Sequence, residues 1–246
     1  MRAVCIALLL SVAVAGRGHA AAQERGDRLR LAVGNFFTVS FDGPQEEALA
    51  ARALESLEKA YWRIGQTLNT FPSMPIAVVL YTTEEFHDIT RAPAWAAAAY
   101  DGTIRVPMRG ALDKGEELDR VMAHEFTHAL VRTLAAKGVP TWLNEGLATA
   151  LERESLDWAE ERVRRAGGPM ALGRLRSSFG QFGAAQAELA YSTSAIAVRR
   201  LLDEAGGVAV SNLVRDLGRS EPFDAAFAHR MPRSFADFAA SLGAMP

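Results

Sequence analysis

Cysteine is almost absent from this 246-residue chain, and the single one, Cys5, lies in an apolar N-terminal run. A disulfide needs two thiols, and a cysteine hydrolase needs a thiol nucleophile in its mature domain. If the N-terminal run is removed after synthesis, the mature chain contains neither. The sequence therefore excludes a disulfide scaffold and a thiol enzyme.

An excess of positive charge is also lacking. The chain has 27 Lys and Arg against 29 Asp and Glu, a formal net charge of −2 and a pI near 6.2. Proteins that bind nucleic acid or an anionic membrane surface present a basic face to the phosphates. The sequence also lacks a phosphate-cradling glycine loop and the Gly-x-Ser-x-Gly elbow of serine hydrolases. We therefore expect no nucleic-acid partner and no serine hydrolase.

Long apolar runs occur only at the N-terminus. Arg2 is followed by an almost wholly apolar stretch at 4–15, and small residues precede cleavage positions after Ala20 or Ala22. This pattern is typical of a secretory signal peptide, and the run is short for a bilayer span. We predict a signal peptide at 1–22 and a secreted or periplasmic chain with no membrane association after cleavage. An uncleaved N-terminal anchor is the alternative.

The order of the expected elements predicts the fold class. Strand-forming runs lie at 36–41 and 76–81, and an Asp101-Gly102 turn between 97–100 and 103–106 predicts a hairpin. Helical periodicity is found at 45–68, 82–89, 116–136, 141–153, 155–165, 184–206, 208–217, 222–229 and 234–241. Strands followed by helices favour an α+β fold.

The same order predicts how the mature chain is organised. Residues 23–246 are expected to form one compact domain, with a flexible lead-in at 23–34. Within it we expect an N-terminal mixed sheet lobe with helices at about 35–110, two central helices at about 116–153 and a mostly helical lobe at about 155–246.

The feature that carries chemistry is the segment His124-Glu125-Phe126-Thr127-His128 in the helix predicted at 116–136. Residues four apart share one helical face, so both imidazoles can converge on a single ion. Glu125 is rotated by about 100° from His124, which places it beside that ion. There it can take a proton from a water molecule, as proposed for this motif in metalloproteases. Two core or capping histidines near a solvated glutamate are the alternative reading.

A third ligand is expected from the next helix. Gly138-Val139-Pro140 reads as a turn, and Thr141 is a plausible N-cap for the helix that follows. Glu145 then falls in the early turns and faces His124 and His128 if the two helices pack antiparallel. Two histidines and one glutamate are the ligands of several catalytic zinc sites, in which the fourth position stays open.

His-Glu-Phe-Thr-His followed by Trp-Leu-Asn-Glu-Gly-Leu-Ala resembles the gluzincins, the thermolysin and aminopeptidase-N-like metallopeptidases, and especially the compact bacterial proteins called peptidase MA-like. The resemblance is specific over about 120–153 and covers about half of the chain. It implies one Zn²⁺ per chain held by His124, His128 and Glu145, with Glu125 as general base for hydrolysis of a peptide or protein.

The resemblance extends to two further features. Tyr191 lies where aminopeptidase-like gluzincins have a tyrosine that donates its hydroxyl to the developing oxyanion, and such a donor can lower a barrier by several kcal/mol. His229 is a weaker candidate for that role. The hairpin near 97–106 is similar to the edge strand along which gluzincins bind an extended substrate.

The sequence departs from the family pattern in two places. Where thermolysin-like enzymes have an aspartate that orients a zinc-bound imidazole, this chain has Thr149, whose hydroxyl could serve more weakly. The Gly-x-Met-Glu-Asn segment by which related aminopeptidases hold a free amino terminus is missing, which favours an endopeptidase. A catalytically inactive binding module of the cell envelope, or a zinc amidase acting on non-protein material, are the alternatives.

Overall fold

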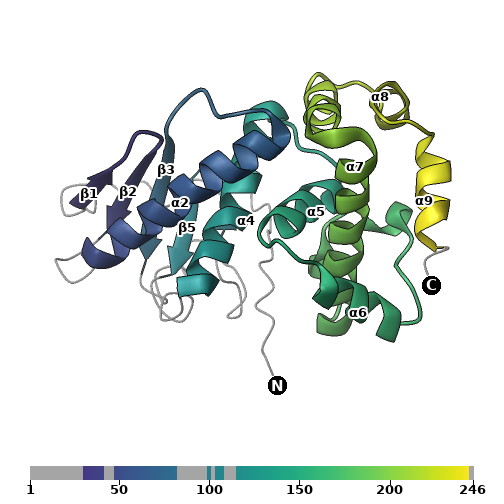
Figure 1. Ribbon diagram of the computed structural model, residues 1–246, viewed down its shortest axis with the longest axis horizontal. Coiled ribbons are helices and arrows are strands. Elements are labelled where there is room, and N and C mark those ends of the chain that lie inside the picture. The colour runs from purple at the N-terminus through teal and green to yellow at the C-terminus, as the bar shows by residue number, and fades with distance from the viewer. Residues whose placement is uncertain (1–29, 42–46, 82–98, 101–102, 108–114, 244–246) are drawn as a thin grey trace.

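The computed structural model describes residues 30–41, 47–81, 99–100, 103–107 and 115–243. The expected signal peptide at 1–22, the short helix at 82–89 and the Asp101-Gly102 turn lie outside the described residues. Figure 1 shows the strands and α2 at one end of the molecule, α8 and α9 at the other, and α4 and α5 between them. The fold is α+β.

The strands form one mixed sheet with the order β1-β2-β3-β5-β4. Their bounds are Arg30–Val33 (β1), Phe37–Phe41 (β2), Ile76–Tyr81 (β3), Ala99–Tyr100 (β4) and Ile104–Pro107 (β5). The central pairs β2–β3 and β3–β5 are parallel, whereas β1–β2 and β4–β5 are antiparallel. The two arms of the predicted hairpin therefore do pair, and β4 forms one edge of the sheet.

The strand β1 corrects the prediction of a flexible lead-in, because part of that segment is ordered against the sheet. Arg30 pairs with Phe41 and Val33 with Thr38. Leu31 and Val33 are 61% and 71% exposed, so burial of apolar side chains does not hold this strand. Main-chain hydrogen bonds to β2 hold β1 in place, and hydrophobic patterns in a sequence do not reveal such bonds.

The helices follow the predicted periodicity closely. They are α2 (Glu47–Leu68), α4 (Gly115–Leu134), α5 (Thr141–Leu151), α6 (Asp157–Arg165), α7 (Ala184–Gly218), α8 (Phe223–Arg230) and α9 (Phe235–Gly243). Two short 3-10 helices at Leu172–Leu175 and Phe179–Gln181 were not predicted. The predicted break between 206 and 208 is present, because Gly206 has φ 79° and interrupts the helical geometry of α7. Gly207 then passes the end of α2 so closely that a Cβ would lie 1.7 Å from the Thr67 carbonyl oxygen.

One continuous cluster of buried side chains runs from the sheet to the C-terminal helix, from Phe37 in β2 to Phe238 in α9. α2 packs on the sheet through Tyr61, and α4 packs on it through Phe126, whose ring lies 5.8 Å from that of Phe37. α4 packs against α2 and the sheet on one side and against α5 on the other. α5 packs in turn on α7. Among the described residues, no helix is long and apolar enough to span a bilayer.

Candidate metal centre

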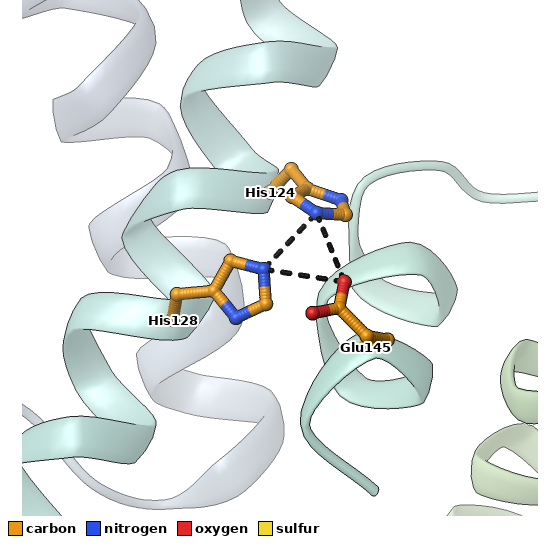
Figure 2. Close-up of side chains that lie close together, drawn as sticks. All are labelled: His124, His128 and Glu145. Atoms are coloured by element: carbon orange, nitrogen blue, oxygen red, sulfur yellow. Dashed lines mark hydrogen bonds and ion pairs between the residues drawn. The ribbon is translucent and has the colours of Figure 1, made fainter. Parts of the chain in front are cut away.

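His124 and His128 lie one turn apart on the face of α4 that is turned toward α5 (Figure 2). Both side chains are buried, and their Nε2 atoms lie 3.1 Å apart. Two imidazole nitrogens at this separation can share a proton or bind the same ion. The helical spacing of the motif therefore produces the convergence that the sequence predicts.

Glu145 brings its carboxylate from α5 to the same point. Its Oε2 atom lies 3.6 Å from Nε2 of His128 and 3.8 Å from Nε2 of His124 (Figure 2). Zinc–ligand bonds of about 2.0–2.2 Å at tetrahedral angles place ligand atoms roughly 3.3–3.6 Å apart. The three observed separations bracket that range, so the triangle has the size that one zinc ion requires.

The start of α5 differs from the prediction. Pro140, not Thr141, is the N-cap residue, and it caps the helix without a side-chain hydrogen bond. Its carbonyl oxygen accepts from the amides of Leu143 and Asn144, and the Thr141 amide donates to the carbonyl of Arg176. Proline suits this position because it has no N–H to leave unpaired.

Several buried polar atoms near this point have no hydrogen-bond partner among the described residues. They include both carboxylate oxygens of Glu125, Oε2 of Glu145 and Nδ1 of His128. Burying a carboxylate without a partner is costly, and proteins normally offset it with a cation, a hydrogen bond or a proton. A divalent ion between the two imidazoles and Glu145 would supply that compensation, so the residues present fit a zinc ion.

The acidic groups show the effect of this burial on proton affinity. Burial raises the pKa of Glu125 to about 7, against the opposing charge of His124. Burial raises the pKa of Glu145 to about 8, again against His124 and with the help of the neighbouring carboxylates. Both groups therefore exchange protons near neutral pH in the metal-free protein, which is where a general base is most useful.

The pKa values of the two imidazoles are shifted in opposite directions. Burial, together with the charge of His124, lowers the pKa of His128 well below its ordinary value. Asn144 acts against that shift, although Nδ1 of His128 makes no hydrogen bond of normal geometry to it. Burial is the largest effect on His124 and lowers its pKa, but the contact with Glu152 and the charges of Glu125 and Glu145 together outweigh burial and raise the pKa of this imidazole. His128 is thus held neutral, as a metal ligand must be.

Glu152, which sequence reasoning missed, orients His124. Its Oε2 atom lies 2.7 Å from Nδ1 of His124, and a carboxylate can only accept there. Nδ1 therefore carries the hydrogen, and in the neutral ring Nε2 presents its lone pair toward His128 and Glu145. Thr149 does not fill this role, because its buried hydroxyl has no partner among the described residues. The available signal was the spacing of seven from Glu145, which places Glu152, the C-cap residue of α5, about two turns further along the same side.

Tyr191 lies in the second turn of α7 and is buried, with its ring edge-on to Phe179 at 5.2 Å. Burial and the charges of Glu145 and Glu125 raise the pKa of its hydroxyl well above the ordinary value. The hydroxyl is therefore a proton-bearing donor near both carboxylates. His229 lies elsewhere: its side chain is 75% exposed on α8 and pairs with Glu221 at 3.3 Å. It is a surface histidine in the last turn of α8.

No family model matches this sequence. No curated protein matches it either. Among solved structures, the fold is similar to that of Legionella pneumophila aminopeptidase A in complex with aspartic acid, with a TM-score of 0.54 and 15% identity over 87% of this chain and 28% of that one. A two-domain M1 zinc metallopeptidase, solved as a point mutant, matches with TM-scores of 0.47 bound to L-arginine and 0.45 bound to L-tryptophan. The identities are 17% and 16%, over 87% of this chain and 50% of theirs.

The likeness to aminopeptidase A is one of fold. This chain spans 28% of that structure's length and half of the length of the M1 metallopeptidase. At 15% identity, a shared fold does not carry the substrate of one chain over to the other.

Proposed function

We propose that this chain is a zinc-dependent peptidase that cleaves peptide bonds outside the cytoplasm. The observation that carries the proposal is the buried triangle of His124, His128 and Glu145, with the carboxylate of Glu125 beside it. The fold shared with an aminopeptidase supports a hydrolase of peptides. His124, His128 and Glu145 would hold the ion.

A zinc ion bound there would polarise the scissile carbonyl and favour deprotonation of the attacking water. Glu125 accepts the proton of that water and later returns it to the leaving amine. A pKa near 7 suits both halves of this task, because the group can take up and release the proton at neutral pH. Glu125 has no hydrogen-bond partner in the described residues, so its oxygens are free to bind the water.

Tyr191 supplies a hydrogen bond to the reacting carbonyl of the substrate in this proposal. Its hydroxyl stays protonated because burial and the nearby carboxylates oppose ionisation. A protonated hydroxyl can donate to the oxygen that becomes negative as the carbonyl is attacked. Tyr191 therefore stabilises the transition state, and Glu125 moves the proton.

The substrate is proposed to be a peptide or protein bound as an extended strand. β4 is the edge of the sheet beside α4, and an edge strand offers main-chain hydrogen bonds to such a peptide. The missing amino-terminus motif favours cleavage within a chain. The apolar leader at 1–22 favours secretion or the periplasm.

The experiment uses the mature chain loaded with one equivalent of zinc, wild type and Glu125→Gln, on a broad peptide library with blocked and free amino termini. We expect wild type to cleave blocked peptides, and Glu125→Gln to keep its zinc while losing about 100- to 10,000-fold in kcat/KM, the usual range for a general base. Equal activity of the two proteins would show that Glu125 is not the base.

The same assay separates the alternatives. Cleavage of free amino termini alone would indicate an aminopeptidase. Cleavage of peptidoglycan fragments in place of peptides would indicate an amidase. A wild-type chain that binds zinc, cleaves nothing and supports its cellular phenotype equally well as Glu125→Gln would be a binding module.

A further inference from the structure

Five side chains interleave between α4 and α5 in a regular order. α4 contributes Arg120, His124 and His128 at intervals of four residues. α5 contributes Glu145, and Glu152, seven residues later, is the C-cap residue of that helix. Glu145 lies between His128 and His124, and Glu152 lies between His124 and Arg120. The candidate zinc ligands are thus one part of a longer ladder whose last member is an arginine.

We propose that Arg120 is a positioning residue for the zinc site, acting on His124 through Glu152. The proposal rests on the proposed function, because it concerns the metal that the function requires. The guanidinium of Arg120 holds the Glu152 carboxylate in one orientation, and that carboxylate holds the His124 ring with Nε2 directed at the site.

The geometry of the Glu152 carboxylate supports this role. Nη1 of Arg120 donates to Oε1 at 3.2 Å, while Oε2 accepts from Nδ1 of His124 at 2.7 Å. Each oxygen is therefore assigned to its own partner. Without Arg120, Oε1 would lose its buried partner and the carboxylate could rotate about its side chain.

Burial distinguishes Arg120 from the second arginine at the same oxygen. Nε of Arg153 also approaches Oε1, at 3.5 Å, but its side chain is 45% exposed, whereas that of Arg120 is 10% exposed. Exposed ion pairs are screened by water and contribute little, whereas loss of one partner of a buried pair is costly. Arg120 should therefore fix Glu152, and Arg153 should contribute little.

The charges of the buried side chains also favour a role for Arg120. Glu125, Glu145 and Glu152 are buried together, and their charges act on one another. Arg120 offsets one of three negative charges, and a divalent ion would offset the other two. Arg120 is the most buried cation in contact with this group of carboxylates, and it also lies 3.7 Å from Glu117.

The test measures zinc affinity by competition with a chromophoric chelator in the full mature chain. Removal of partners that orient metal ligands usually costs about 10- to 100-fold in metal affinity. We expect Arg120→Met to weaken zinc binding by about that factor, Arg120→Lys to restore most of it, and Arg153→Met to change it less than about threefold. If Arg120→Met does not fold, Arg120→Gln replaces it.

A double-mutant cycle separates positioning from general stability. In a Glu152→Gln background, Arg120→Met should have little further effect on zinc affinity, because the link to His124 is already broken. Equal effects in both backgrounds, or a loss of thermal stability with unchanged zinc affinity, would overturn the inference and leave the proposed function standing. A wild-type chain that binds no zinc would overturn both.

Discussion

Gly146 lies directly against the carbonyl oxygen of Ser194, and a Cβ at Gly146 would be 2.5 Å from that oxygen. The glycine follows Glu145, so this close contact between α5 and α7 lies one residue from the carboxylate of the candidate metal site. Nothing larger than hydrogen fits there unless the two helices separate.

Gly146→Ala is therefore predicted to move α5 and with it Glu145. Forcing a methyl group into packed backbone costs about 1–3 kcal/mol, and we expect a loss of stability of that order with weaker zinc binding. Gly173→Ala is the matched control, since a Cβ there meets nothing within 4 Å. Chemical denaturation and zinc titration of both variants check the prediction. Wild-type zinc affinity in Gly146→Ala would show that the close packing does not position Glu145.

Tyr191→Phe should separate catalysis from metal binding. The variant keeps the ring that packs on Phe179 and loses only the hydroxyl. Removing one oxyanion donor costs about 100- to 1,000-fold in kcat, and we expect that loss with unchanged zinc content. Tyr61→Phe, another buried tyrosine but on α2, should stay within about twofold of wild type. Similar steady-state rates for both variants would remove Tyr191 from the mechanism.

The raised pKa of Glu125 predicts a pH dependence of stability in the metal-free protein. The unfolded chain releases this proton near pH 4.5 and the folded chain near 7, so wild type loses stability as pH rises through that window. Glu125→Gln has no such proton to lose. Its stability relative to wild type should grow by on the order of 3 kcal/mol between pH 4.5 and 7, because one pKa unit corresponds to about 1.4 kcal/mol.

Urea denaturation of both proteins in a chelator at pH 5, 6, 7 and 8 measures that difference. The contribution of Glu145, whose pKa is raised to about 8, is present in both proteins and largely cancels. Parallel stability curves across this range would mean that Glu125 is not desolvated in the folded chain.

Most of the candidate metal site follows from local spacing. The interval of four between His124 and His128 fixes a shared helical face, and Glu145 requires only that the next helix fold back on the first. These features depend on residues close in sequence, which is why they could be predicted. The helices predicted at 141–153, 184–206 and 208–217 follow from local periodicity too, and they correspond to α5 and to the two parts of α7 on either side of Gly206.

What could not be predicted depends on which side chains meet after packing. The partner of His124 could be any polar residue on the facing side of α5, and the resemblance directed attention to Thr149 when Glu152, one turn later, makes the contact. The strand β1 was missed because its exposed Leu31 and Val33 leave no burial pattern. The contact of His124 with Glu152 and the pairing of β1 with β2 each join residues that sequence periodicity does not relate.

The zinc content of the purified mature chain, measured by mass spectrometry alongside His128→Ala and Glu145→Ala, tests the proposed metal ligands. We expect about one zinc per wild-type chain and strongly reduced zinc in both variants, with all three proteins folded. Wild-type chain without zinc, or variants that retain it in full, would contradict the claim that His124, His128 and Glu145 hold the metal.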